Sequence, residues 1–467
     1  MLWLSLDRNS DIPLIRQIYL GLRDKILTGE LAAGDRLPAT RELAAEWGVS
    51  RNVILEAYDQ LTAEGYITGQ QGSGTYVAEG AQWQPLQESF NPTNRSLPQP
   101  SPSTNPTDLI DFRSGVPALD HFPKKLWGQL SREVYAELPP TVMGYGTAEG
   151  SLELRSVLAA YLRKTRGLQC DAEQIVMTSG AAQAFALVAK LLLAPGDRVA
   201  IEDPIARELW DIYNSVEALL YPVPVGDRGI QPAFLPTDPP PKLTHVTPSH
   251  QFPLGSILSI QNRIELLKFA QQTSSFIVED DYDSEFRYEG TPINSLQELD
   301  PERVIYVGTF SKILAPALRL GYLVLPPSLI QPCRWLKRLN DLHTPLFEQF
   351  TLARFIQLGH LERHINRMKK LYRDRRNTLR QALRDRFSTQ VNILGDSTGL
   401  HLVAEFPDFQ FSESRLHTIE QHRVRVYPVS IHAIAPEKHH HKIILGYSNL
   451  APSQIELGIK RLQEALG

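Results

Sequence analysis

The sequence is poor in cysteine and has no long apolar run. Only Cys170 and Cys333 occur among 467 residues, and they lie far apart. This argues against a disulfide scaffold and fits a reducing cytoplasm, where we expect the protein to act. No stretch approaches the roughly 18 apolar residues that cross a bilayer. The first residues, 1–7, lack the basic segment of a signal peptide, so we expect none.

The sequence also has no excess of basic residues. It carries 48 Lys and Arg against 52 Asp and Glu, a formal net charge of -4, which gives nucleic-acid binding no general support. The hydrophobic fraction of 42 % and the charged fraction of 21 % are those of a globular protein. Because 467 residues exceed one ordinary hydrophobic core, we expect two domains.

Composition divides the chain into three zones. Residues 1–80 have mainly helical patterns, residues 81–107 are rich in proline and small polar residues, and residues 108–467 alternate apolar runs with helical stretches. The middle zone cannot bury enough apolar area to order itself, and its prolines make it an extended spacer. We therefore predict two domains, 1–80 and 108–467, joined by a Pro-rich linker.

The last zone predicts an α/β fold. Short apolar runs such as Gln174–Met177, Phe276–Val278 and Arg303–Val307 are spaced by helical segments. This arrangement indicates a mostly parallel sheet covered by helices on both faces. In such sheets ligands collect at the carboxyl ends of the strands, which is where Asp280 and Lys312 fall.

The lysine and the aspartate have a joint chemical meaning. Lys312 closes the segment Thr309-Phe310-Ser311-Lys312 just past one strand, and Asp280 ends an earlier strand. A lysine in this place can form a Schiff base with an aldehyde cofactor, while an aspartate can keep a pyridine nitrogen protonated. Together, and with Arg319 following, they predict a site for pyridoxal 5'-phosphate (PLP).

Other residues are placed to hold the phosphate of PLP. Gly180 and Ala181 follow a strand and open a helix, so their backbone N–H groups are candidate phosphate donors. The hydroxyls of Thr309 and Ser311 would complete the cup with the guanidinium of Arg319, which gives the charge-assisted hydrogen bonds that phosphate favours.

Tyr282 lies two residues after Asp280, on the same side of an extended segment, and can donate to the 3′-oxygen of the cofactor. The nearby acidic residues can be solvated or structural: Asp281, Asp283 and Glu285. A metal loop is the alternative, but no glycine stands where an EF-hand turn needs one. The tract His439–His441 reads as a surface loop or as a metal tract. We predict no metal site.

Residues 12–79 predict a winged helix-turn-helix. Apolar residues recur with a helical period over Ile12–Leu27, and two further helices begin with Thr40 and Ser50 as N-caps. Two short strands, Gly65–Thr68 and Gly74–Val77, then flank a glycine-rich tip. The third helix of such a module can enter the major groove of DNA.

The residues suited to DNA contact lie at the start of the third helix and around it. Arginine and asparagine can contact guanine and adenine edges, and arginines can also clamp phosphates. The candidates are Arg36, Arg41, Ser50, Arg51, Asn52 and, at the tip of the hairpin, Gly72. Residues 1–79 nevertheless hold seven basic and eleven acidic residues. The alternative is a small helical dimerisation module with incidental arginines.

Both halves resemble known families. Residues 11–78, above all GDRLPATRELAAEWGVSRNVILEAYDQLTAEGYI, resemble the GntR family of bacterial repressors. Residues 108–467 resemble fold-type I PLP aminotransferases in the motifs GYGTAEGSLELR, TSGAAQA, VTPSHQFPLG, EDDYDSEFRYEG and GTFSKILAPALRLGY. The whole chain therefore resembles the MocR/GabR-type regulators.

The resemblance implies a homodimeric, DNA-binding transcriptional regulator that binds operator DNA. It also implies that Tyr145 reaches the phosphate site of the neighbouring subunit. The expected effector is PLP itself or the external aldimine that PLP forms with a small amine or amino acid.

Three departures from the aminotransferase pattern favour binding over turnover. Ile205 replaces the usual aromatic ring over the cofactor, Phe252 replaces an asparagine, and Ile444 replaces the arginine that grips a substrate carboxylate. Arg207, or else Arg425, can take an effector carboxylate instead. Two alternatives remain open: a catalytically active PLP-dependent aminotransferase with an accessory DNA-binding head, and a regulator that has lost PLP.

Overall fold

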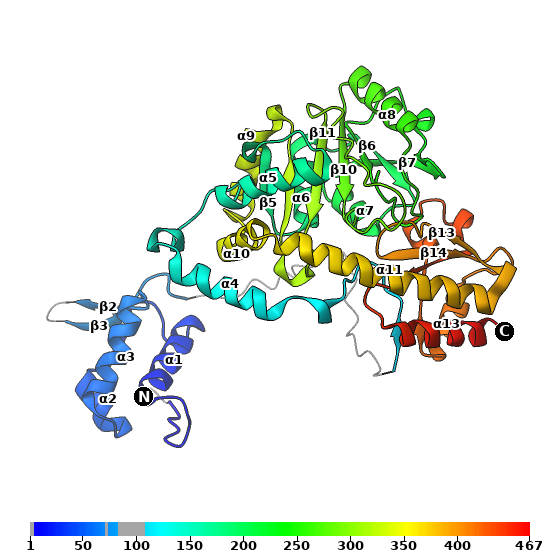
Figure 1. The fold of residues 1–467 in the computed structure, drawn as a ribbon. Helices are drawn as coiled ribbons and strands as arrows, with labels where there is room; N and C mark the ends of the chain where they lie inside the picture. The colour runs from blue at the N-terminus through cyan, green and yellow to red at the C-terminus, as the bar shows by residue number, and fades with distance from the viewer. Residues whose placement is uncertain (1–3, 71–72, 83–107) are drawn as a thin grey trace. The chain divides into compact units, whose positions relative to one another are not determined.

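The computed structural model describes residues 4–70, 73–82 and 108–467 (Figure 1). The chain divides into an N-terminal unit, residues 1–103, and a C-terminal unit, residues 104–467. Most of the predicted linker, residues 83–107, lies outside the described residues, so the linker stays a prediction. Within the described ranges, every helix is too short or too polar to span a lipid bilayer.

The N-terminal unit contains three helices and a small antiparallel sheet in the order β1-β3-β2. Its elements are α1 (Leu14–Leu27), β1 (Arg36–Leu37), α2 (Thr40–Trp47), α3 (Arg51–Ala63), β2 (Ile67–Gln70) and β3 (Gly74–Val77). The core joins Ile18 and Leu22 of α1 to Ile54 and Leu61 of α3, all fully buried.

One predicted helix cap in this unit is wrong. Thr40 is the first residue of α2, and the N-cap is Ala39, whose backbone N–H donates to the Glu42 carboxylate at 3.3 Å. The Glu42 carboxylate thus accepts a hydrogen bond at the N-terminus of α2, where the Thr40 hydroxyl was expected to do so. Ser50 is the N-cap of α3 as predicted, although its hydroxyl makes no capping hydrogen bond.

The C-terminal unit is built on an eight-stranded sheet in the order β5-β12-β11-β10-β9-β6-β7-β8. Its strands are β5 (Ile175–Thr178), β6 (Arg198–Asp203), β7 (Leu219–Gly226), β8 (Gly229–Ile230), β9 (Leu243–Val246), β10 (Phe276–Asp281), β11 (Val304–Thr309) and β12 (Gly321–Val324). The five strands β11, β10, β9, β6 and β7 are parallel, whereas β12 runs antiparallel to both of its neighbours.

Alternate residues of each strand face different helices, because successive side chains of a strand point to opposite faces. Val176, Val278 and Ile305 pack against α6 (Ala181–Leu192), α7 (Arg207–Asn214) and α9 (Ile330–Asp341). Their neighbours Ile175, Ile277 and Tyr306 pack on the other face, where α5 (Leu152–Arg166) and α8 (Ile260–Thr273) lie.

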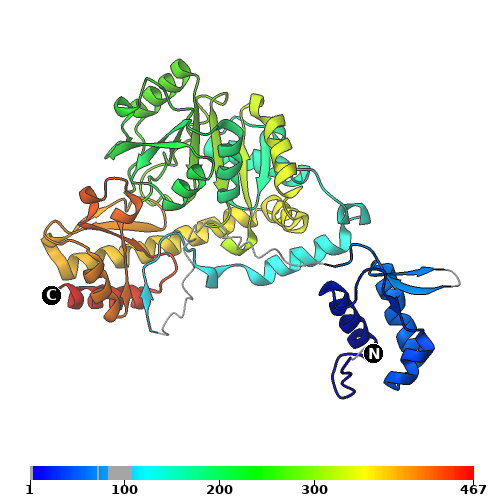
Figure 2. The same cartoon turned by 180° about the vertical axis from the view of Figure 1, so that it is seen from behind.

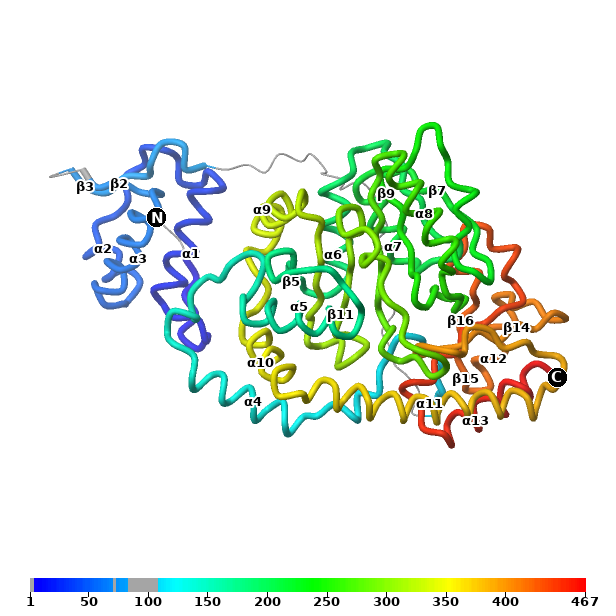
Figure 3. Tube along the Cα trace, turned by 45° about the horizontal axis from the view of Figure 1, so that its top comes forward, coloured from blue at the N-terminus to red at the C-terminus, as the bar shows by residue number. Residues whose placement is uncertain are grey.

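A second, smaller sheet follows, in the order β13-β14-β17-β16. Its strands are β13 (Asn392–Leu394), β14 (His401–Glu405), β16 (Tyr427–Pro428) and β17 (Lys442–Gly446). Seen from behind, the long helix α11 (His360–Phe387) runs from beneath the large sheet to this smaller one (Figure 2). It packs side by side with α13 (Pro452–Leu466) (Figure 3).

The remaining elements complete the unit around these two sheets. They are β4 (Ile110–Asp111) with its partner β15 (Val424–Arg425), and the helices α4 (Lys124–Glu137), α10 (Leu346–Gln357) and α12 (Glu413–Gln421).

Candidate functional site

Lys312 lies in the turn after β11, and its side chain is largely buried. Its amine donates to the Gly115 carbonyl at 2.7 Å. Gly115 has a φ of +71°, which favours glycine, and a Cβ there would lie 2.8 Å from the amine nitrogen and would displace it. Burial lowers the pKa of the Lys312 amine, although the charges of Asp283 and Asp280 oppose the shift. A less protonated amine is the form that attacks an aldehyde.

Asp280 lies near the end of β10 with its carboxylate on the α6 and α7 face of the sheet, and 13 % of the side chain is exposed. The acids before and after it, Glu279 and Asp281, point to the opposite face and are buried there. Asp281 pairs with the buried guanidinium of Arg166 at 2.7 Å and accepts from the Tyr306 hydroxyl at 2.5 Å. Strand alternation therefore presents one carboxylate to the site and gives its neighbours structural roles.

The phosphate end of the site depends on two glycines. Gly180, the N-cap of α6, has a φ of +92°, and a Cβ on it would lie 2.8 Å from the Arg319 guanidinium. A Cβ on Gly321 of β12 would lie equally close to the Gly180 carbonyl carbon. Because both residues lack a side chain, Arg319 can donate to the Ser179 carbonyl beside the start of α6. Guanidinium and helix N-terminus thus converge, as a phosphate requires.

The two hydroxyls predicted to bind phosphate, those of Thr309 and Ser311, lie at the carboxyl end of β11 and in the turn that follows it. Thr309 and Ser311 are both buried. The Thr309 hydroxyl accepts from the Ser311 backbone N–H at 3.2 Å. The helix start carries Ala181 next to Gly180, as predicted.

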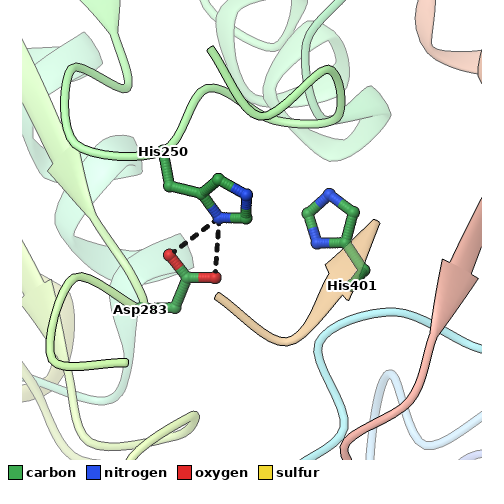
Figure 4. Close-up of side chains that lie close together, drawn as sticks. All are labelled: His250, Asp283 and His401. Carbon is green, nitrogen blue, oxygen red and sulfur yellow. Dashed lines mark hydrogen bonds and ion pairs between the residues drawn. The ribbon is translucent and has the colours of Figure 1, made fainter. Parts of the chain in front are cut away.

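Tyr282 contacts a buried group that the sequence did not indicate. Its hydroxyl donates to the His250 carbonyl at 2.9 Å and lies 3.1 Å from His250 Nδ1. The same nitrogen lies 3.0 Å from the Asp283 carboxylate, and His401 of β14 faces the pair (Figure 4). Ligand atoms of His250, Asp283 and His401 lie within 4.8 Å of one another. The hydrogen bond between imidazole and carboxylate joins His250 to Asp283, whereas His401 Nε2 contacts the Pro253 carbonyl at 3.0 Å.

The residues considered for an effector carboxylate differ in their surroundings. Arg207 is exposed at the start of α7, and its guanidinium stacks 4.2 Å over the Trp210 ring. Arg425 is held by the carboxylates of Glu420 and Asp111. Ile444 is fully buried in β17, so nothing polar replaces the arginine of aminotransferases at that position.

Tyr145 and Ile205 differ strongly in exposure. Tyr145 is 87 % exposed, and its ring meets the edge of His343 at a centroid distance of 6.3 Å. Ile205 is 1 % exposed and belongs to the core beneath α6 and α7.

The candidate DNA-contacting residues of the N-terminal unit share one surface property. Arg36, Arg41, Ser50, Arg51 and Asn52 are all exposed. Among the described residues, none of these three arginines forms an ion pair. By contrast, Arg23 pairs with Asp24 at 2.7 Å, and Lys25 pairs with Glu30. Within the described ranges Arg8 and Arg16 also form no ion pair, so this property is shared by other cations of the unit; Arg8 donates to the Gly48 carbonyl and Arg16 lies over the Tyr19 ring. Gly72 lies outside the described residues.

Sequence reasoning missed Gly115, Tyr213, His245, His250 and His401. His250 stands in the motif VTPSHQFPLG, which was the available signal for it. For the other four no local signal was recognised, because their roles come from strand pairing and from contacts between distant segments.

Two family models match this chain. Residues 14–77 match bacterial regulatory proteins of the gntR family, and residues 107–443 match aminotransferase class I and II. The chain is 35 % identical over 478 residues to the probable rhizopine catabolism regulatory protein MocR of Rhizobium meliloti, covering 99 % of this chain and 95 % of MocR. It is 34 % identical over 465 residues to the uncharacterized HTH-type transcriptional regulator YdeL of Bacillus subtilis, covering 98 % of each.

A solved structure extends the comparison to the fold. The alpha-aminoadipate aminotransferase LysN of Thermus thermophilus, complexed with N-(5'-phosphopyridoxyl)-L-leucine, matches with a TM-score of 0.70 and 26 % identity, covering 77 % of this chain and 92 % of LysN. The predicted combination of a helix-turn-helix with a fold-type I, mostly parallel α/β domain is confirmed. The chain belongs to the MocR-type HTH transcriptional regulators, in which a GntR domain precedes an aminotransferase-like domain.

Proposed function

We propose that this regulator binds PLP covalently through Lys312 and that PLP, alone or joined to a small amine or amino acid, is the effector that controls operator binding. One observation carries the proposal. The part-buried Lys312 amine, the Asp280 carboxylate and the Arg319–Gly180 cradle lie at the carboxyl ends of β11, β10 and β5, three strands of one sheet, with the antiparallel β12 between β5 and β11. The structural relative LysN holds a phosphopyridoxyl ligand on the same fold.

Each residue has a definite task in this proposal. Bound PLP supplies an aldehyde and an electron-withdrawing ring. The Lys312 amine leaves Gly115 to become the point of attachment, and Asp280 holds a proton on the pyridine nitrogen. Five residues at the phosphate end of the site would bind the phosphate of PLP: Gly180, Ala181, Thr309, Ser311 and Arg319. Tyr282 donates to the 3′-oxygen after a small turn away from His250.

The proposed regulator is a homodimer that works in the cytoplasm. Large apolar or aromatic side chains are exposed on the C-terminal unit, with exposed fractions of 61 % for Trp335, 67 % for Leu339 and 87 % for Tyr145. A second copy would cover them and would bring Tyr145 to the neighbouring phosphate site. We also propose the domain division 1–80, 81–107 and 108–467, which is supported by the change in composition along the chain.

Operator recognition is assigned to the N-terminal unit. Ser50, Arg51 and Asn52 at the start of α3 would read base edges, while Arg36, Arg41 and the hairpin tip at Gly72 would contact the DNA backbone. A dimer carries two such units and fits two half-sites. The effector can shift operator binding only by the difference between its affinities for the two arrangements of the dimer.

The site is suited to binding more than to turnover. Buried Ile444 provides no charge for a substrate carboxylate, and Ile205 provides no aromatic face. We therefore assign Arg207, stacked on Trp210 and exposed, to an effector carboxylate. An active aminotransferase would instead convert amino acid and 2-oxo acid through many turnovers.

Full-length wild type and Lys312→Ala test the proposal. Wild type incubated with PLP should gain a visible absorbance band. Borohydride should abolish that band and leave the phosphopyridoxyl group on Lys312, whereas Lys312→Ala should show neither the band nor the label. Lys190→Ala, an exposed lysine on α6, is the control and should behave as wild type. Fluorescence anisotropy with DNA from upstream of its own gene should then show PLP-dependent affinity in wild type only. Identical affinity with and without PLP or amine would remove the effector role.

A further inference from the structure

A buried tyrosine and histidine stand behind Asp280. His245 lies on β9, the parallel neighbour of β10, and Tyr213 lies on α7. Both side chains are fully buried. The Tyr213 hydroxyl lies 2.8 Å from His245 Nδ1, and His245 Nε2 lies 3.8 Å from Asp280 Oδ2. These contacts form a line that ends on the carboxylate assigned to the pyridine nitrogen.

The hydrogen-bonding capacity of the pair fixes where its protons lie. The Tyr213 hydroxyl has no second hydrogen-bond partner among the described residues, so it must donate to His245 Nδ1 to use its proton. Burial and then the charge of Asp280 raise the pKa of Tyr213, which keeps that proton in place. His245 Nε2 then carries the imidazole hydrogen, and this N–H faces Asp280.

The opposite arrangement of protons is unfavourable. It would leave the Tyr213 proton buried without an acceptor and would turn the Nε2 lone pair toward a carboxylate. Phe185 packs on the imidazole with a centroid distance of 5.0 Å, which limits other orientations of the ring.

His245 Nε2 is an unsatisfied buried donor in this structure. It has no hydrogen-bond partner within the described part of the chain. A buried polar atom without a partner costs free energy, and an apolar residue would fill the same space without that cost. We therefore relate the His245 Nε2–H group to the Asp280 carboxylate, which it faces. At 3.8 Å from Asp280 Oδ2, Nε2 lies just beyond hydrogen-bond distance of that carboxylate.

We propose that Tyr213 and His245 are positioning residues for the cofactor: Tyr213 sets the tautomer of His245, and His245 donates to Asp280. This bond keeps Asp280 ionised and oriented, so that the pyridine nitrogen of PLP stays protonated. The inference rests on the proposed function, because it concerns a residue that acts on bound PLP.

The test uses full-length protein loaded with PLP that carries ¹⁵N in its pyridine ring. In wild type, the ¹⁵N chemical shift should be that of a protonated nitrogen. In His245→Leu the shift should move toward that of neutral pyridine, and PLP affinity should fall by roughly tenfold to a hundredfold, as for a lost hydrogen bond to a charged group. Tyr213→Phe should change the ¹⁵N chemical shift and the PLP affinity in the same directions as His245→Leu, but to a smaller extent.

Two further variants separate positioning from packing. His245→Gln can place an amide N–H near the Nε2 position and should restore much of the wild-type shift. Tyr306→Phe is the matched control, because it also removes a buried tyrosine hydroxyl, but one that donates to Asp281 on the opposite sheet face. Its ¹⁵N shift should equal that of wild type.

The outcomes distinguish this inference from the proposed function. Wild type that binds PLP while His245→Leu and Tyr213→Phe keep its ¹⁵N shift would overturn the positioning role alone. Wild type that binds no PLP would overturn the proposed function itself. If His245→Leu does not fold, Tyr213→Phe decides the question, because it removes a single oxygen atom.

Discussion

The two units of this chain place their important side chains in opposite environments. In the N-terminal unit, the candidate DNA contacts are exposed, and its arginines near α3 are unpaired among the described residues. In the C-terminal unit, Gly180, Thr309 and Ser311 are buried and Asp280, Tyr282 and Lys312 are partly buried, whereas Arg319 is exposed. Several of these residues contact segments distant in the sequence, as Lys312 contacts Gly115. All thirteen histidines of the chain, beginning with His121, fall in the C-terminal unit.

This difference fits the ligands proposed for the two units. A DNA backbone is bound at the protein surface by arginine and lysine side chains, and DNA affinity falls as the salt concentration rises. A small cofactor is bound where protein replaces water, so each polar atom needs an internal partner. Changes in the first unit should therefore alter DNA affinity with little effect on folding, whereas changes in the second should alter stability, pH dependence and cofactor state together.

The largest expected effect concerns a buried histidine. Burial lowers the pKa of His364 to about 4, and its Nε2 contacts the Ile313 carbonyl at 3.0 Å. Because the unfolded chain takes up this proton near pH 6.5, His364 adds stability above that pH and loses it as pH falls toward 4. The loss should be roughly 3 kcal/mol. His364→Gln keeps a donor for Ile313 but does not titrate.

Urea unfolding of wild type and His364→Gln at several pH values between 7 and 4 measures this effect. The difference between their unfolding free energies should shift in favour of the variant as pH falls. A constant difference would show that the pKa of His364 is the same in the folded protein as in the unfolded chain. The N-terminal unit, residues 1–80, has no histidine and should contribute nothing of this kind.

An intermediate effect is expected at the DNA surface. Arg51→Ala should weaken operator binding by about 1–3 kcal/mol, because it removes a base or phosphate contact. Arg23→Ala is the matched control, since Asp24 already pairs with Arg23 at 2.7 Å. Anisotropy titrations at two salt concentrations measure both variants. Equal losses in the two would contradict the assignment of α3 to the operator, and thermal unfolding should stay close to wild type in each.

The smallest expected effect compares two helix caps. The Ser151 hydroxyl accepts from the Leu154 N–H at 3.1 Å and caps α5, so Ser151→Ala should cost about 1 kcal/mol of stability. Ser50 makes no such bond. Ser50→Ala should therefore cost only a few tenths of a kcal/mol in stability while weakening operator binding. Denaturant unfolding and anisotropy together check the pair, and a larger stability loss in Ser50→Ala would reverse the comparison.

Several features of the fold were predictable because they depend on local pattern. Apolar runs predicted the strands that precede Asp280 and Lys312, and the order of elements predicted the winged helix-turn-helix. The antiparallel insertion of β12 between β5 and β11 was not predictable from such runs, because strand order depends on tertiary packing. The same reason applies to the partners of the site residues. No local pattern relates His245 to Asp280, or Gly115 to Lys312, before the strands are paired.

The position of β12 also has a consequence for biosynthesis. This strand, Gly321–Val324, lies between β5 and β11, so the phosphate cradle and the turn bearing Lys312 have no common support until residue 324 has left the ribosome. The N-terminal unit is complete more than two hundred residues earlier. A nascent chain thus completes its helix-turn-helix unit first and its aminotransferase-like unit last, and it passes through a stage in which the former is formed without the latter.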